Sequence, residues 1–134
     1  FTGGTMVYKL DYTDTEVWKV INEHPYQDLE MYEVSNLGRV RSRARHIERK
    51  GGGSYFRQAY VRRPFLCSRG FVTLTLFTRE TKALTVRVHR LVACMFLAKE
   101  INKEAVVFLD GDRKNCSVTN LMYVSSIHKN HYNP

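Results

Sequence analysis

The stretch VVFLDGDRKNCSVTN, residues 106–120, constrains the fold more than any other part of this 134-residue chain. Its apolar start, Val106 to Leu109, predicts a short buried strand. The DGD triplet that follows predicts a tight turn, because Gly111 can adopt a positive φ at little cost. A polar loop then leads to Asn120, where the next element opens. Before this stretch, His89 to Leu97 is an apolar run with the spacing of a short helix.

A second pattern predicts a β-hairpin just upstream of that helix. Residues 70–77, GFVTLTLF, alternate in the manner of a half-buried strand and form the clearest strand signal in the chain. Residues 78–82 predict the hairpin loop, and residues 83–88 predict the returning strand. We therefore expect an α+β fold made of small antiparallel β-sheets and hairpins.

The first part of the chain carries weaker signals. Glu16 to His24 predicts a short helix, because Thr15 is a suitable N-cap and Pro25 ends it. Residues 7–14 can be read either as a strand or as a disordered lead-in. Residues 1–5, FTGGT, follow no period, and we expect them to be a cloning remnant outside the fold.

A strand, a turn and a second strand are predicted next. Tyr32 and Val34 alternate as on a strand, residues 35–38 have turn composition, and Val40 restarts an extended segment. The pattern indicates a second hairpin at the start of the chain.

Charge is distributed unevenly along the sequence. Residues 39–90 contain fourteen Lys and Arg against two Glu, whereas residues 1–38 contain two Lys against seven Asp and Glu. A middle segment this basic is typical of a chain that binds a polyanion. The alternative is that the charge serves solubility alone. Solubility favours positive and negative residues that are mixed along the chain, and here they are segregated.

Four arginines fall on alternate positions: Arg39, Arg41, Arg43 and Arg45. If they share one strand, all four side chains leave the same face and can follow a phosphate backbone or enter a minor groove. The alternative is a solvated edge strand whose charge prevents aggregation.

A glycine-rich loop, residues 50–54, is flanked by basic and aromatic residues. Tyr55, Phe56 and Tyr60 either stack on nucleic acid or face the core. The candidate nucleic-acid ligands over this whole region are Arg39, Arg41, Arg43, Arg45, Arg49, Lys50, Arg57, Arg62, Arg63 and Arg69.

Two motifs resemble a known family. Trp18 with Tyr-x-Val-Ser-Asn-x-Gly-x-Val-x-Ser at residues 32–42 resembles the small DNA-binding motif found beside the nuclease core of phage and intron homing endonucleases. Residues 88–93, VHRLVA, and residues 106–121 resemble the HNH core of the same enzymes, the ββα-metal fold. The resemblance implies two segments, residues 6–63 with the N-terminal motif and residues 64–134 with a degenerate HNH-like core. This sequence departs from the family pattern in the long loop at residues 50–54 and in the residues that stand at the catalytic positions.

The resemblance implies a nuclease site whose chemistry is missing. Val107 stands where the family has a metal-binding Asp or Asn, and Phe108 stands where it has the His that acts as general base. Asn120 is retained at a metal-ligand position. We therefore expect no catalytic residue, no bound metal and no cofactor. The alternative is an active nickase with a rearranged site that uses His89, Asp110 and Asn120 with a Mg²⁺-type ion.

The expected function is binding of duplex DNA by an inactive HNH-type protein of phage or mobile-element origin, as a repressor, competitor or inhibitor. The alternatives are the nickase, RNA binding, and a basic module that docks an acidic protein. His128 and His131 are expected to lie in an exposed tail, with weak transition-metal binding as the alternative. No membrane segment is seen, and the three separated cysteines favour a reducing cytoplasm, that of the bacterial host if the origin is phage. Oligomeric state has no signal in the sequence.

Overall fold

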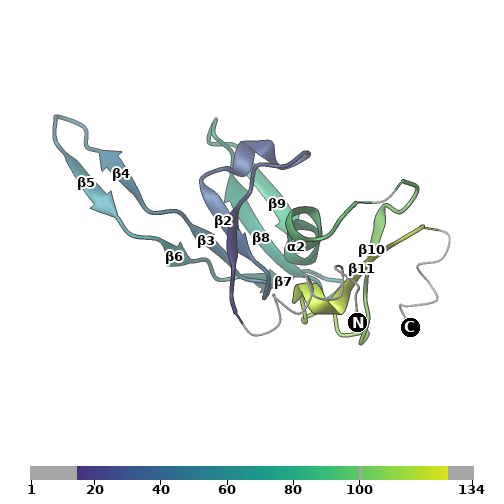
Figure 1. Ribbon diagram of the computed structural model, residues 1–134. Helices are drawn as coiled ribbons and strands as arrows, with labels where there is room; N and C mark the ends of the chain where they lie inside the picture. Colours follow the sequence, from purple (N-terminus) through teal and green to yellow (C-terminus); the bar gives the residue numbers. More distant parts are fainter. Residues whose placement is uncertain (1–14, 100, 127–134) are drawn as a thin grey trace.

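A computed structural model describes residues 15–99 and 101–126. The elements in chain order are β1 (Trp18–Val20), the 3-10 turn η1 (Gln27–Leu29), β2 (Tyr32–Ser35), β3 (Val40–Ser42), β4 (Arg45–Glu48), β5 (Ser54–Arg57), β6 (Tyr60–Val61), β7 (Phe65–Leu66), β8 (Val72–Phe77), β9 (Ala83–Arg87), the helix α2 (Val88–Phe96), β10 (Ala105–Phe108), the 3-10 turn η2 (Val118–Asn120) and β11 (Leu121–Val124). All strand pairings are antiparallel. Over the described residues, the architecture is the expected α+β arrangement of small sheets beside the helix α2 (Figure 1).

The first sheet has the strand order β1-β2-β3-β6. Its first strand corrects the helix predicted at residues 16–24: Trp18 pairs with Ser35 and Val20 pairs with Glu33 across the sheet. The aromatic and β-branched residues of this segment favour extended backbone, and pairing with β2 outweighs the capping signal of Thr15. The turn predicted at residues 35–38 is confirmed, with Gly38 at φ +91°.

The hairpin predicted at residues 70–88 is also present. Strands β8 and β9 pair from Thr73 opposite Arg87 to Phe77 opposite Ala83, and β7 joins the other edge of β8. The chain passes without a loop from β9 into α2, whose apolar face lies against the sheets. None of the described helices is long and apolar enough to cross a membrane.

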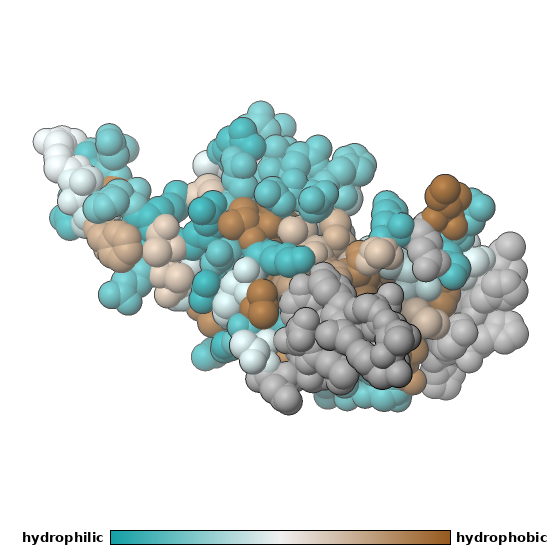
Figure 2. Space-filling model, viewed as in Figure 1, coloured by the Kyte–Doolittle hydropathy of each residue, from teal (hydrophilic) through white to brown (hydrophobic). Residues whose placement is uncertain are grey.

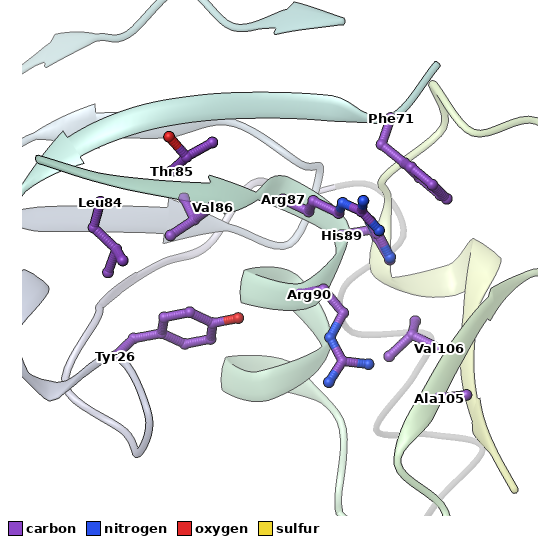
Figure 3. Close-up of a pocket in the computed structure, with 10 residues that line it drawn as sticks. All are labelled: Tyr26, Phe71, Leu84, Thr85, Val86, Arg87, His89, Arg90, Ala105 and Val106. Atoms are coloured by element: carbon purple, nitrogen blue, oxygen red, sulfur yellow. The ribbon is translucent and has the colours of Figure 1, made fainter. Parts of the chain in front are cut away.

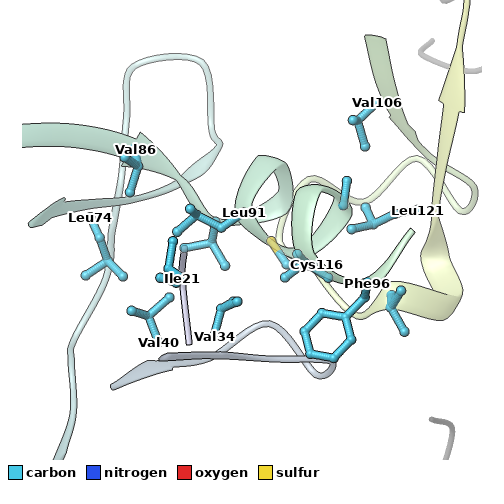
Figure 4. Close-up of a cluster of buried hydrophobic side chains, with 14 of the residues drawn as sticks. Ile21, Val34, Val40, Leu74, Val86, Leu91, Phe96, Val106, Cys116 and Leu121 are labelled. Atoms are coloured by element: carbon cyan, nitrogen blue, oxygen red, sulfur yellow. The ribbon is translucent and has the colours of Figure 1, made fainter. Parts of the chain in front are cut away.

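One core joins the N-terminal motif to the C-terminal hairpin β10–β11 (Figure 4). It contains Ile21, Val34 and Val40 from the first sheet, Leu74 and Val86 from β8 and β9, Leu91 and Phe96 from α2, and Val106, Cys116 and Leu121 from the C-terminal region. The 63/64 segment boundary stays a prediction, since side chains from both segments share this core.

The turn at Gly38 makes a close contact between the two motifs. A Cβ at Gly38 would lie 2.8 Å from the Cβ of Cys116, so only glycine allows this approach. Beside it, the backbone N–H of Val118 donates to the carbonyl of Asn36 at 2.8 Å. The side chain of Asn36 is itself buried and accepts from the N–H of Val17 at 2.6 Å. The Ser-Asn-x-Gly motif therefore closes a turn and docks it on the C-terminal region.

Beyond the first sheet, strands β4 and β5 form a two-stranded arm that projects from the body (Figure 1). We use the name "arm" for residues 45–57. Almost every side chain in these two strands is exposed. The glycine-rich loop predicted at residues 50–54 is the tip, where Gly51, Gly52 and Gly53 all have positive φ.

Candidate nucleic-acid interface and the degenerate nuclease site

Phe108 and Val107 are part of the protein interior. Phe108 is 1% exposed and Val107 is fully buried, and both lie in β10 opposite β11. The Phe108 ring lies 4.7 Å from the ring of His89 and 6.1 Å from that of Phe71, measured between centroids. The position where the family has its general base therefore holds an apolar ring packed in an aromatic cluster.

His89 belongs to the same cluster. It lies at the N-terminal end of α2, is 4% exposed, and stacks on Phe71 at 5.2 Å. Its Nδ1 has no hydrogen-bond partner among the described residues. Burial, together with the positive charges of Arg90 and Arg87, lowers the pKa of His89 to about 3. The imidazole is therefore neutral at physiological pH.

A pocket of about 430 Å³ lies beside this cluster (Figure 3). His89 and Phe71 line it together with Arg87, Arg90 and the ring of Tyr26. None of the described residues that line it is acidic, so its polar groups are cationic or neutral and favour anions over metal ions.

Asp110, Asn115 and Asn120 form a hydrogen-bonded clasp around the DG turn. The Asn120 amide accepts from the N–H of Asp110 at 3.0 Å and donates to the Asp110 carboxylate at 2.9 Å and to the Asn115 carbonyl at 2.9 Å. The Asn115 amide donates to the other carboxylate oxygen at 3.0 Å. This hydrogen bond, followed by those from the N–H of Asp112 and from Asn120, holds the pKa of Asp110 below its usual range.

The hydrogen bonds of the clasp give a structural role to the polar residues that match the family pattern. Gly111 has φ +77° and its N–H donates to the carbonyl of Phe108, as the predicted tight turn requires. Asn120 ends the 3-10 turn η2, and Leu121 begins a strand rather than a helix. Both polar atoms of the Asn120 amide are engaged within the turn.

The described residues do not fit a divalent metal ion at this site. The side chains of Val107 and Phe108 supply no metal-donor atom. The Asn120 amide and the Asp110 carboxylate are already hydrogen-bonded to each other. No group of three or more His, Cys, Asp and Glu side chains in the described residues is placed to hold a metal. No hydrogen bond in the described part of the chain joins His89 to Asp110 or Asn120. His128 and His131 lie outside the described residues.

The predicted row of four arginines is not one strand. Strand β3 ends at Ser42 and β4 begins at Arg45, so Arg43 lies in the break between them. Arg43 donates to the carbonyl of Glu30 at 2.9 Å, and Arg45 reaches the sulfur of Met31 at 3.9 Å. The single-strand prediction is wrong because a two-residue interruption separates the first sheet from the arm.

Arg39 and Arg41 are paired with carboxylates on the outer face of the first sheet. Arg39 donates through Nε to Glu16 at 2.9 Å, and Arg41 donates through Nε to Glu33 at 2.8 Å. Both guanidinium groups also lie over the ring of Trp18, at 5.5 and 4.1 Å. The bond from Arg39 lowers the pKa of Glu16. The acidic and basic segments that are separate in the sequence thus neutralise each other where β1, β2 and β3 pair.

The arm has two different faces. Cross-strand pairing places Arg45 beside Arg57 and Ile47 beside Tyr55 on one face, and the Arg49 guanidinium lies 4.7 Å from the Tyr55 ring. The pairs His46–Phe56 and Glu48–Ser54 occupy the other face, where the His46 and Phe56 rings meet edge to face at 5.4 Å. Figure 2 shows the arm as a largely hydrophilic projection.

The aromatic residues of this region do not face the core. Tyr55 and Tyr60 are 40% exposed and Phe56 is 55% exposed, which excludes the core-facing alternative. That these rings stack on nucleic acid stays a prediction. Of the other predicted ligands, Arg49 and Lys50 lie at the arm's tip, Arg63 is exposed after β6, and Arg69 lies in the β7–β8 turn, where its carbonyl accepts from Arg113.

Arg79 is a candidate ligand that the sequence patterns did not predict. It lies in the β8–β9 turn, and its N–H donates to the carbonyl of Asp28 at 3.1 Å, which brings it near the base of the arm. Its guanidinium pairs with Glu30 at 2.7 Å. No local pattern predicts this contact, because it depends on how the β8–β9 hairpin packs on the first sheet.

Comparisons with known proteins agree with this architecture. The family model described as the NUMOD4 motif matches residues 16–77, and the model described as HNH endonuclease matches residues 86–131. Among solved structures, the chain is similar to the protein in "DNA binding and cleavage by the HNH homing endonuclease I-HmuI", with a TM-score of 0.61 and 28% identity. The match covers 86% of this chain and 56% of that one, so this chain spans little more than half of its length. Curated protein sequences gave no match.

The chain is therefore a protein of the HNH homing-endonuclease type, with a NUMOD4 motif followed by an HNH segment. The resemblance drawn from residues 32–42 and 88–121 is confirmed, as is the α+β fold class.

Proposed function

We propose that this protein binds duplex DNA and does not cut it. One observation carries the proposal: the residue at the general-base position, Phe108, is packed in the core, while the arm presents arginines to solvent. A phenyl ring cannot take a proton from water, and loss of a general base alone lowers a rate by about 10²–10⁴-fold.

Binding in this proposal rests on the exposed basic residues of the arm and its base. Phosphate contacts provide the sequence-independent share of protein–DNA affinity, and a two-stranded β-ribbon can enter the major groove. The similarity to a DNA-cleaving homing endonuclease supports DNA as the nucleic acid, and RNA and acidic proteins are competitors in the test below. Such a protein acts as a repressor, a competitor for a cleavage site, or an inhibitor of another DNA-handling protein.

We propose that this activity is cytoplasmic, in a bacterial host cell if the protein is of phage origin. The three cysteines, Cys67, Cys94 and Cys116, are all free thiols, as expected in a reducing compartment.

The binding half of the proposal is tested by a gel shift of labelled duplex DNA over a series of salt concentrations. We expect log K to fall linearly with log [salt], with a slope of about 0.9 for each phosphate contacted. A matched RNA duplex and an acidic protein serve as competitors. Absence of a shift at about 50 mM salt would contradict DNA binding, since counterion release makes binding strongest at low salt.

The second half is tested with supercoiled plasmid, in Mg²⁺ and separately in Mn²⁺. We expect the plasmid to remain supercoiled at protein concentrations that saturate binding. Nicking that is abolished by Asn120→Ala would establish the rearranged nuclease instead. An Asn120→Ala variant that nicks as well as the wild type would point to a contaminating nuclease.

A further inference from the structure

A cleft of about 500 Å³ lies where the arm joins the body. Its walls come from four separate parts of the chain: the start of β2, the junction between β3 and β4, the segment from the end of β5 to just past β6, and the β8–β9 turn. Five arginines line it: Arg43, Arg45, Arg57, Arg62 and Arg79. The volume is in the range of ordinary ligand sites, which is about 300–1,000 Å³.

The charge in this cleft is largely uncompensated. None of the described residues that line it is acidic. Arg79 pairs with Glu30, whereas Arg45, Arg57 and Arg62 have no carboxylate of the described chain within ion-pair distance. This contrasts with Arg39 and Arg41, which are equally basic in sequence but neutralised in the fold.

Tyr60 organises the arginines on one wall. Its hydroxyl accepts from Arg57 at 2.9 Å, and the guanidinium groups of Arg57 and Arg62 lie 4.7 and 6.0 Å from its ring. A hydrogen bond with Ser42 is the main cause that lowers the pKa of Tyr60, and the charges of Arg57, Arg62 and Arg45 add to it. Each guanidinium keeps further N–H donors for a ligand, because arginine has five.

The cleft also bridges the interruption between the arm and the body. Two residues separate β3 from β4, and two residues separate β5 from β6. Arg45 and Arg57 pair across the arm, whereas Arg62 follows β6 in the first sheet, where its N–H donates to the carbonyl of Val40. An anion in the cleft would therefore be held from both sides of the interruption.

We infer that this cleft is a site for adjacent phosphate groups of one DNA strand, and that their binding ties the arm to the body. The inference rests on the proposed function and names where the duplex backbone is held. Phosphodiester oxygens suit clustered guanidinium groups, which donate in a planar fork. The same chemistry is offered by a free polyphosphate, and the experiment separates the two sources.

The test compares two double variants that each remove two positive charges. Arg57→Gln with Arg62→Gln removes the two guanidinium groups that lie beside Tyr60 in the cleft. Lys99→Gln with Lys114→Gln is the matched control, because both lysines are exposed and neither lines the cleft. Thermal unfolding of each variant checks that the fold is retained.

Two quantities are measured for each protein: the salt dependence of duplex DNA affinity, and the binding of inorganic tripolyphosphate by titration calorimetry without DNA. We expect the cleft variant to lose about one unit of the salt slope for each arginine removed, and the control to keep the wild-type slope. Tripolyphosphate should bind the wild type and the control, compete with DNA, and lose its binding in the cleft variant.

The outcomes separate this inference from the proposed function. A cleft variant with the same slope as the control overturns the phosphate site and leaves DNA binding in place. A wild type that binds tripolyphosphate through the cleft but does not bind duplex DNA overturns DNA as the occupant, together with the proposed function. Loss of slope and of tripolyphosphate binding in the cleft variant alone supports the inference.

Discussion

The arm and the degenerate nuclease site contrast in how their polar groups are used. In the arm and the cleft at its base, Arg45 and Arg57 are exposed and Arg62 is half-buried, and none of the three has a carboxylate partner in the described chain. In the degenerate site, the Asn120 amide is bonded on both sides and Phe108 is enclosed in the core. Unsatisfied charge on a surface favours a ligand, whereas satisfied polar groups favour the fold itself.

The contrast is the basis of the proposed function, which assigns DNA binding to the arm and no catalysis to the degenerate site. The DG turn, Asn120 and His89 resemble catalytic features in sequence, yet their contacts are those of a scaffold. The arginines of the arm match no catalytic pattern in the sequence, yet they are the groups with N–H donors available for a ligand. The predictions below test each side of this comparison.

The largest expected effect is on stability at the degenerate site. Phe108→Ala should lower the free energy of unfolding by about 3–5 kcal/mol, because it leaves a cavity in the aromatic cluster with His89 and Phe71. Leu109→Ala is the control, since its side chain is 48% exposed and should cost much less. Chemical denaturation measures both. Equal effects would mean that Phe108 is not a core residue.

Charge reversal on the arm should act on binding and not on stability. Arg45→Glu with Arg57→Glu is expected to weaken duplex DNA binding on the order of 100-fold at moderate salt, since phosphate contacts are replaced by repulsion. The melting temperature should be unchanged, because these side chains are exposed in a two-stranded arm. Gel shift and thermal unfolding give the two values. A variant that keeps full affinity would place the binding surface elsewhere.

Asn120→Ala tests whether the clasp is structural. It removes the buried amide that bonds Asp110 and Asn115, so we expect a loss of about 1–3 kcal/mol in unfolding free energy. If Asn120 serves the turn alone, the loss should be the same with EDTA and with Mg²⁺ in the buffer, because its hydrogen bonds are all to protein groups. Dependence of the loss on Mg²⁺ would show that Asn120 is a metal ligand after all.

The effect that is smallest at neutral pH is a pH dependence from His89. Its pKa is about 3 when folded, below the usual 6.5, so the unfolded chain binds the proton more readily between these values. The stabilisation from keeping His89 neutral is complete above about pH 6.5, and it falls by up to about 1.4 kcal/mol for each pH unit toward pH 3. Denaturation curves of the wild type and of His89→Phe, between pH 7 and 4, measure the difference. A constant difference across that range would contradict the burial of a neutral imidazole.

Much of the fold follows from local patterns. The alternation of residues 70–77 predicts β8, the apolar run after residue 88 predicts α2, and the DG pair predicts the turn at Gly111, because each depends on neighbours in the chain. The helix predicted at residues 16–24 is wrong for the opposite reason. Its strand exists only because β2 lies beside it, and that partner is distant in sequence.

The candidate site likewise has features that follow from the local sequence and others that depend on long-range contacts. The replacement of the general base by Phe108 is visible in one residue of the sequence, and so is the excess of arginine over residues 39–90. The sequence cannot show which arginines are free, because Glu16 and Glu33 reach Arg39 and Arg41 only when β1, β2 and β3 pair. Arg79 reaches the cleft through packing alone.

By itself the sequence determined the family, the α+β class, the loss of donor atoms at residues 107 and 108, and the basic middle segment. Only the tertiary structure decided that the arginines divide into paired and unpaired sets, that Arg45, Arg49 and Arg57 lie on one face of the arm, and that the Asn120 amide bonds within the turn. The physical reason is that residue type fixes which bonds a group can form. Its partners are set by long-range packing, which brings distant segments together.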